Sequence, residues 1–163
     1  MSPAEELRYL ILAAQREGNR ELARALRPLG LTPAQAEVLV VLGAGAPLSV
    51  RALGARLVCE GGSPSRLVAA LVEAGLVERR TSPEDARRSV LRLTAAGQAA
   101  LEGVHGVETT LHAAIQAAGS EPELAGVVTV LRRLVADRPA GRAIELRGGG
   151  PDTRGARGPE ARA

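Results

Sequence analysis

The chain of 163 residues is 45% hydrophobic and 24% charged, a composition typical of a soluble globular protein that is long enough to bury one core. Its net charge is +3, and all 21 basic residues are arginine, so the absence of lysine excludes a Walker phosphate loop and a Schiff-base mechanism. Because the sequence also lacks a G-x-S-x-G elbow, a CxxC pair and a dinucleotide-binding glycine fingerprint, we expect no enzyme activity and no cofactor.

The first part of the chain is predicted to form two helices. An apolar stripe at helical spacing predicts a helix over about residues 3–29, with Gly18 as a weak point. Thr32 and Gln35 then form a capping box for a second helix. The apolar positions of the two helices are Leu7, Leu10, Ile11, Ala14, Leu22, Leu26 and Leu29, and then Val38, Leu39, Val41 and Leu42.

Two shorter helices follow, separated by a glycine turn. Ser49 is a good N-cap for a helix from about Val50 to Val58. Ser63 can cap the next helix, which should end at Gly75, and Pro64 fits its first position. Its predicted apolar stripe consists of Leu67, Val68, Leu71 and Val72, which leaves Ser65, Arg66, Ala69, Ala70 and Glu73 facing outward.

The outward face of this helix suits a DNA major groove. Arginine can bridge guanine or phosphate, hydroxyls reach phosphates or base edges, and alanine permits close approach. An ordinary amphipathic surface helix has a similar pattern, so the helix alone leaves both interpretations open. The candidate DNA-binding residues are Ser63, Ser65, Arg66 and Ala69.

The next segment is predicted to be a β-hairpin. Leu76 to Arg80 and Ser89 to Leu93 carry strand-forming residues, and the residues between them are turn formers and charges. A flexible basic loop beside a recognition helix can place arginine in the narrow, electronegative minor groove. The hairpin adds Arg79, Arg87 and Arg88 to the candidate DNA contacts, and Asp85 could hold the side chain of Arg87 in position.

The remainder of the chain is predicted to form two helices and a tail. Thr94 caps a helix that runs past Ile115, and Ser120 and Glu123 form a capping box at the start of another. The last helix has too many apolar positions for a solitary surface helix, which favours a contact with a second subunit over packing within one chain. These positions are Leu124, Val127, Val128, Leu131, Leu134 and Val135. Glycine, proline, arginine and alanine dominate from Pro139 onward, so we expect residues 139–163 to be a disordered tail.

The charge is unevenly distributed along the chain. Residues 45–94 contain eight arginines and five acidic residues, whereas residues 95–137 contain two and five. A positive lobe on an acidic base is expected of a DNA-binding protein. Scatter of surface charge could produce the same numbers and stays open as the alternative.

Taken together, these motifs resemble the MarR (multiple antibiotic resistance regulator) family of transcription factors over about Ala4 to Asp137. The matching segments are Leu31-Thr-Pro-Ala-Gln-Ala-Glu-Val-Leu39, Ser65-Arg-Leu-Val68, Gly75-Leu-Val-Glu-Arg-Arg80, Asp85-x-Arg87 and Leu93-Thr94. The resemblance implies one domain over residues 1–138 that is mainly α with a small β-hairpin wing. Its winged helix-turn-helix would span about residues 45–94, inside a helical dimerisation frame formed by about residues 3–29 and 95–137.

The resemblance also implies a function. Members are homodimers that bind pseudo-palindromic double-stranded DNA and are usually released by a small ligand or oxidant. Arg66 would then lie on the recognition helix and Arg87 at the wing tip, with Asp85 as its orienting partner. We therefore expect a DNA-binding transcriptional regulator, in the first instance a repressor of a nearby gene. The alternative is a winged-helix module whose positive wing docks on an acidic protein without sequence-specific DNA binding.

Further expectations concern the effector and the location. By the resemblance, an effector pocket would lie between the dimerisation helices and the DNA-binding lobe. Because the chain has no Phe or Trp and Tyr9 is its one tyrosine, the lining of that pocket should be aliphatic. No stretch reaches membrane-spanning length and no targeting signal is visible, so we expect a cytoplasmic protein with no membrane partner.

Two small groups are candidate sensors. His105, Glu108 and His112 share one helix face and could bind a divalent metal, but three ligands on one helix rarely make a closed site, and solvated or core histidines are favoured. Cys59 lies in the turn before the recognition helix, where its oxidation could disturb DNA binding. Since no second cysteine could resolve a sulfenic acid, a small apolar filler is the favoured interpretation.

Overall fold

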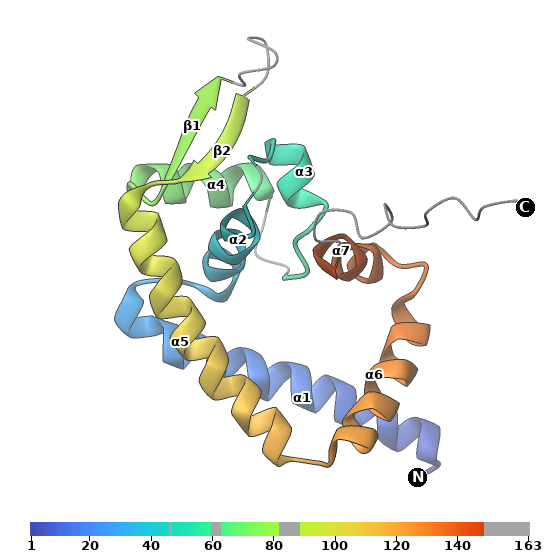
Figure 1. Ribbon diagram of the computed structural model, residues 1–163. Helices are drawn as coiled ribbons and strands as arrows, with labels where there is room; N and C mark the ends of the chain where they lie inside the picture. Colours follow the sequence, from blue (N-terminus) through green and yellow to red (C-terminus); the bar gives the residue numbers. More distant parts are fainter. Residues whose placement is uncertain (46, 60–62, 82–88, 149–163) are drawn as a thin grey trace, which may run out of the picture.

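A computed structural model describes residues 1–45, 47–59, 63–81 and 89–148 of the chain (Figure 1). Helices make up most of it, in chain order α1 (Pro3–Leu26), the 3-10 turn η1 (Arg27–Leu29), α2 (Pro33–Gly43), α3 (Val50–Gly54) and α4 (Pro64–Glu73), followed by α5 (Ala95–Ala117), α6 (Glu121–Val135) and α7 (Pro139–Gly148). A two-stranded hairpin of β1 (Val77–Thr81) and β2 (Ser89–Leu93) stands between α4 and α5. The predicted fold class, mainly α with a small β-hairpin wing, is confirmed.

The predicted helix starts are confirmed, because capping depends on side chains only a few residues apart. The Thr32 hydroxyl accepts a hydrogen bond from the Gln35 amide at 3.3 Å, and the Gln35 side chain accepts one from the Thr32 amide at 2.9 Å. Ser49, Ser63 and Thr94 cap α3, α4 and α5 with one such bond each, in which the hydroxyl accepts the amide three residues later. Gly18 does not interrupt α1, which is continuous from Pro3 to Leu26.

Helix α2 lies at the centre of the core (Figure 1). It is apolar on nearly all sides, and six of its eleven residues are buried. It packs against α1, α4, α5 and β2, whose buried leucines complete one continuous cluster. Leu26, Leu39, Leu53, Leu71, Leu91 and Leu101 are its largest fully buried members. The core therefore joins the helix-turn-helix to the long helices α1 and α5.

The wing is antiparallel, with Val77 opposite Leu93 and Thr81 opposite Ser89. Leu91 is fully buried at its base, where the Leu91 amide donates to the Leu48 carbonyl at 2.8 Å. This bridge ties the segment before α3 to β2, so the wing is anchored on the helix-turn-helix rather than standing alone.

Three expectations about the elements are wrong. Helix α3 ends at Gly54 rather than near Val58, because the amides of Val58 and Cys59 donate to the carboxylate of Glu37 on α2 instead of to helix carbonyls. Val72, expected in the apolar stripe of α4, is 37% exposed because it lies at the edge of the buried face.

The third error concerns the tail, because residues 139–148 form helix α7 instead of a disordered segment. The disordered tail is predicted because this segment has few large apolar side chains, but α7 packs through small residues. Gly141 and Ala143 are buried, and a Cβ on Gly141 would lie only 1.9 Å from the Val135 carbonyl oxygen at the end of α6. The rest of the expected tail, residues 149–163, lies outside the described residues.

No helix in the described part of the chain is both long and apolar enough to cross a membrane.

Candidate nucleic-acid interface

The outer face of α4 is open to solvent. Ser65, Arg66 and Ala69 are exposed, while Leu67, Val68 and Leu71 are buried on the opposite side. The Ser63 hydroxyl accepts a hydrogen bond from the Arg66 amide at 3.3 Å. The predicted exposed face is confirmed by this burial pattern, whereas the DNA contacts of its residues stay a prediction.

Helix α4 is held at both ends. At its start, Pro64 packs so closely on α3 that a Cβ on Gly54 would lie 2.8 Å from the Pro64 Cγ atom. At its end, Gly75 has φ +71°, a left-handed conformation that favours glycine, and the Leu76 amide donates to the Leu71 carbonyl at 2.9 Å. The exposed face of α4 therefore has a fixed position relative to the wing.

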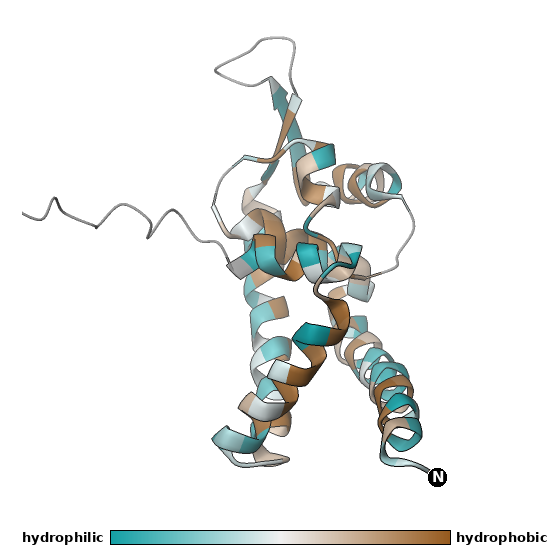
Figure 2. Ribbon diagram, turned by 90° about the vertical axis from the view of Figure 1, so that its right-hand side faces the viewer, coloured by the Kyte–Doolittle hydropathy of each residue, from teal (hydrophilic) through white to brown (hydrophobic). Residues whose placement is uncertain are grey.

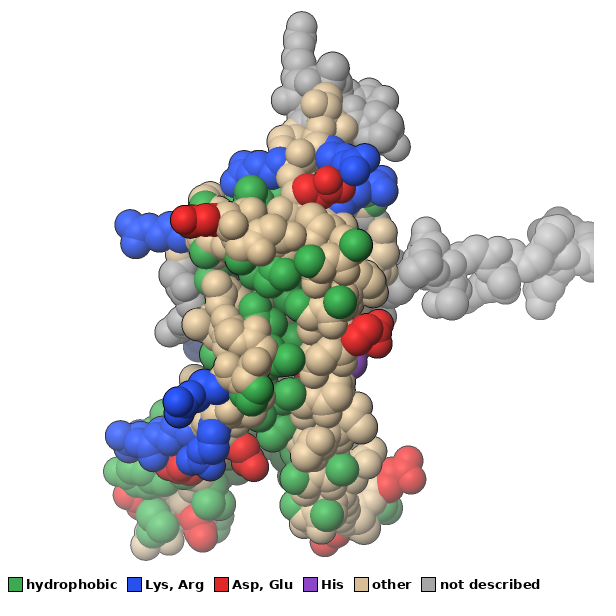
Figure 3. All heavy atoms as spheres, turned by 90° about the vertical axis from the view of Figure 1, so that its left-hand side faces the viewer, with side chains coloured by type: hydrophobic (Ala, Val, Ile, Leu, Met, Phe, Trp, Pro, Cys, Tyr) green, Lys and Arg blue, Asp and Glu red, His purple; other side chains and the backbone are tan. Residues whose placement is uncertain are grey.

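Arginines surround the base of the wing (Figure 3). Arg79 and Arg80 of β1 and Arg92 of β2 are all exposed. The Arg80 guanidinium makes an ion pair with Glu78 at 2.7 Å, and Glu78 also stands opposite Arg92 in the strand register. Arg79 points to the other face of the strand and makes no ion pair with another described residue, so its charge is more available to a partner. Asp85, Arg87 and Arg88 lie outside the described residues.

Comparison with known proteins decides the family. The sequence model of the MarR family matches residues 29–88, which include α2, the helix-turn-helix and β1. A putative transcriptional regulatory protein for the hcr operon of Thauera aromatica is 31% identical over 134 residues, which cover 82% of this chain and 81% of that protein. The chain belongs to the MarR family.

Solved structures of MarR family proteins have the same fold. Apo MarR from E. coli is 29% identical with a TM-score of 0.64, over 83% of this chain and 98% of that one. A MarR cysteine variant from E. coli, complexed with operator DNA, is 30% identical with a TM-score of 0.70, over 80% of this chain and 94% of that one. The PcaV regulator from Streptomyces coelicolor, in complex with its natural ligand, is 26% identical with a TM-score of 0.63, over 85% and 94%. MarR family members are DNA-binding transcription factors rather than enzymes, and so is this chain.

The environment of Cys59 in this MarR family protein favours a protonated thiol. Cys59 is half-buried and packs against the hydrophobic core. Burial, reinforced by the Glu37 carboxylate, raises the pKa of the Cys59 thiol to about 11. Because the thiolate is the reactive form, these surroundings support the packing interpretation over that of a redox sensor.

The three residues proposed as metal ligands lie on α5. His105 and His112 are exposed and Glu108 is half-buried. Among the described residues, no group of three His, Cys, Asp or Glu side chains is placed to hold a metal ion. The geometry of this MarR family protein therefore adds no support to the metal hypothesis.

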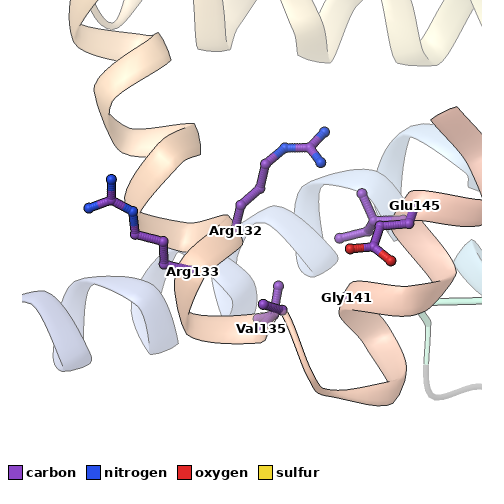
Figure 4. Close-up of a pocket in the computed structure, with 7 residues that line it drawn as sticks. Arg132, Arg133, Val135, Gly141 and Glu145 are labelled. Carbon is purple, nitrogen blue, oxygen red and sulfur yellow. The ribbon is translucent and has the colours of Figure 1, made fainter.

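Open cavities that the described residues line also lie outside the α4 face, and two of them matter here. One of about 200 Å³ lies where α2, β2 and the start of α5 meet, and Arg92 and Gln98 line it together with Leu42, Leu91 and Leu93. The family resemblance predicts the effector pocket at this place, between the helix-turn-helix with its wing and the long helix α5, but the lining is mixed rather than aliphatic. The other, of about 240 Å³, lies between α6 and α7 (Figure 4). Val135 lines it at the end of α6, where the side chains of Arg132 and Arg133 extend in different directions.

One arrangement near the recognition helix was missed by the sequence analysis. The carboxylate of Glu37 on α2 accepts the amides of Val58 and Cys59 and pairs with Arg147 of α7. The sequence does contain a signal for Glu37, because Glu37 is the only charged residue in the apolar helix α2. No signal exists for Arg147, which is 110 residues away along the chain.

Proposed function

We propose that this regulator is a homodimeric repressor that binds a pseudo-palindromic operator through α4 and the wing and dissociates when a small effector binds. The observation that carries the proposal is the exposed polar and cationic face of α4, beside strands that carry exposed arginines, at one end of the molecule (Figure 1). As a DNA-binding regulator, the protein would act in the cytoplasm.

Helix α4 is the proposed reading element for the major groove. Ala69 follows Ser65 by four positions and Arg66 by three, so the three exposed residues lie on one side of the helix. Arg66, in the first turn, has the reach to bind the O6 and N7 atoms of guanine, while Ser63 and Ser65 can contact phosphates near the helix N-terminus. Ala69 lets the helix approach the base edges closely.

The wing is the proposed contact to the DNA backbone and minor groove. Arg79 leaves β1 beside α4 with no ion pair to another described residue, so it can bind phosphate. Arg87 and Arg88, which the family resemblance puts at the wing tip, would insert into the minor groove, with Asp85 as the orienting partner of Arg87.

Uncovered apolar faces on the long helices support a homodimer. None of the residues of α6 is buried, and hydrophobic residues recur along it (Figure 2). The most exposed apolar residues of α1, α5 and α6 include Leu7, Tyr9, Leu10, Leu12, Ile115, Val127, Val128 and Leu134. A second copy of the chain would cover these faces, and its two-fold symmetry would match two operator half-sites one helical turn apart.

Relief of repression by an effector is supported by a ligand-bound relative and by a cavity in this structure. PcaV, a relative in fold and sequence, was solved with its natural ligand. The cavity between α2, β2 and α5 offers a place where a ligand could move the wing relative to the long helices. An effector that binds there with higher affinity in the DNA-free conformation would release the operator.

The experiment that tests the proposal is fluorescence anisotropy with the full chain. DNA from upstream of its own gene is compared with a scrambled duplex across a salt series. Arg66→Ala should weaken specific binding by about 1–3 kcal/mol and reduce the preference over scrambled DNA. Arg79→Ala should lower the affinity for both duplexes by the same factor. It should also reduce the slope of log affinity against log salt concentration by about one. Arg27→Ala, on the exposed η1 turn away from α4, is the control for loss of one charge.

Three results would count against the proposal. Equal affinity of the wild type for both duplexes would show that the protein does not recognise a specific DNA sequence. An unchanged affinity of Arg66→Ala would show that Arg66 on α4 does not contact the operator as proposed. Absence of binding to either duplex at low salt, together with salt-sensitive binding to an acidic protein, would favour the protein-interaction alternative.

A further inference from the structure

A buried carboxylate organises the segment that leads into the recognition helix. The Glu37 side chain is 8% exposed and projects from α2 toward the end of α3. Its Oε1 atom accepts the Val58 amide at 2.7 Å, and its Oε2 atom accepts the Cys59 amide at 2.8 Å. These two amides would otherwise lack partners where α3 has ended, so Glu37 replaces the missing helical carbonyls.

Helix α7 supplies the countercharge. The Arg147 guanidinium makes an ion pair with Glu37 through Nη2, and its Nε atom donates to the Arg56 carbonyl at 2.8 Å. Arg147 thus holds the same short segment at two points, one directly and one through Glu37. A buried carboxylate that loses its cation tends to turn toward water, and Glu37 would then release the two amides.

The clamped segment is coupled to the start of α4. Arg56 lies two residues after Gly54, the residue against which Pro64 packs with no room for a Cβ. Pro64 is the first residue of α4, and Ser65 and Arg66 of the DNA-reading face follow it directly. A shift of residues 56–59 would therefore displace the turn that presents those side chains.

We propose that α7 is an intramolecular latch on the helix-turn-helix, with Glu37 and Arg147 as positioning residues for DNA binding. The latch fixes residues 56–59 and, through the Gly54–Pro64 contact, the first turn of the recognition helix. Anything that lifts α7 lowers operator affinity without touching DNA itself. The effect on operator affinity rests on the proposed DNA binding, whereas the latch itself does not.

The latch is tested first without DNA, by amide hydrogen exchange of the full chain followed by NMR. Arg147→Ala should accelerate exchange of the Val58 and Cys59 amides about tenfold, which corresponds to loss of one net hydrogen bond. The core amide of Val104 on α5 should exchange as in the wild type. Arg142→Ala is the matched control, because Arg142 is an exposed arginine of the same helix whose side chain, among the described residues, bonds only to the nearby Asp137 carbonyl. Arg147→Lys should restore part of the protection, since lysine keeps the charge but not the two-pronged geometry.

Unchanged exchange of Val58 and Cys59 in Arg147→Ala would overturn the latch. Equal acceleration of these amides and of Val104 would also overturn it, because Arg147 would then affect only global stability. In the anisotropy assay, Arg147→Ala should lower operator affinity about three- to tenfold while Arg142→Ala leaves it unchanged. Accelerated exchange with unaltered operator affinity would refute the positioning role. Failure of the wild type to bind DNA would refute the proposed function, while the exchange result would still decide the latch.

Discussion

The hydroxyl of Thr94 donates a hydrogen bond to the carbonyl oxygen of Gly75 at 2.6 Å, and this joins the start of α5 to the end of the recognition helix. The hydroxyl oxygen of Thr94 in turn accepts the Gly97 amide at 3.0 Å, and the Thr94 amide donates to the Leu76 carbonyl at 3.1 Å. One residue therefore caps α5 and ties it to the turn after α4. A movement of α5 carries that turn with it.

Thr94→Val is expected to destabilise the protein by about 2 kcal/mol, because it removes an N-cap and the bond to Gly75 at similar side-chain volume. Urea unfolding monitored by far-UV circular dichroism measures the change. Thr110→Val is the matched control, since within the described part of the chain the Thr110 hydroxyl bonds only to the Gly106 carbonyl of its own helix, α5. Equal effects of the two substitutions would show that the Thr94 junction has no special weight.

Gly97→Ala and Gly106→Ala are expected to shift stability in opposite directions. A Cβ on Gly97 would lie 1.9 Å from the Leu76 carbonyl oxygen, a backbone atom that cannot move aside cheaply, so we expect a loss of about 1–3 kcal/mol. A Cβ on Gly106 meets nothing within 4 Å, and alanine at this helical position should stabilise by about 0.5–1 kcal/mol. Thermal unfolding of both variants compares them directly. Stabilisation by Gly97→Ala would contradict the close approach of α5 to Leu76.

The Cys59 thiol is expected to react slowly with iodoacetamide at pH 8. Its pKa of about 11, raised from an ordinary value of 9.0, makes the thiolate about 100-fold scarcer in the folded protein than in the urea-unfolded chain. The folded-state rate should therefore rise with pH up to about pH 11, whereas the unfolded chain should level off near pH 9. A fast reaction of the folded protein at pH 8 would instead support a reactive, sensing thiol.

The same shift predicts a pH dependence of stability. Because the folded-state pKa of Cys59 is above the unfolded one, the folded chain holds the proton more tightly, and this stabilisation is complete below about pH 9. The free energy of unfolding should then fall as the pH rises from 9 to 11. Cys59→Ala should have a flatter profile over that interval. An identical profile for wild type and variant would rule out this contribution.

Leu134→Asp is expected to shift the protein from dimer to monomer, because it puts a charge into the apolar face of α6, where Leu134 is 56% exposed in the single chain. Sedimentation equilibrium should give twice the chain mass of 16.8 kDa for the wild type and a lower average for the variant. Thr129→Asp, on the opposite face of the same helix, is the control and should remain dimeric. A monomeric wild type would remove the dimer from the proposal.

Much of the fold could be predicted because its signals are local. The N-caps at Thr32, Ser49, Ser63 and Thr94 each depend on a side chain and an amide three residues apart, and all four helices begin where these residues indicate. The strands of the wing follow from strand-forming residues on both sides of a segment of turn formers and charges, and their antiparallel pairing is confirmed by the register that sets Val77 opposite Leu93.

The sequence by itself also determined which residues of α4 face outward, since the burial of Leu67, Val68 and Leu71 leaves only one face for Ser65 and Arg66. Tertiary structure alone decided where α3 ends, that residues 139–148 fold as a helix, and that Glu37 and Arg147 meet. The physical reason is that these features depend on partners far away in the chain. A carboxylate on α2 can replace a helix carbonyl, and a helix of small residues can pack, only once the core has brought those segments together.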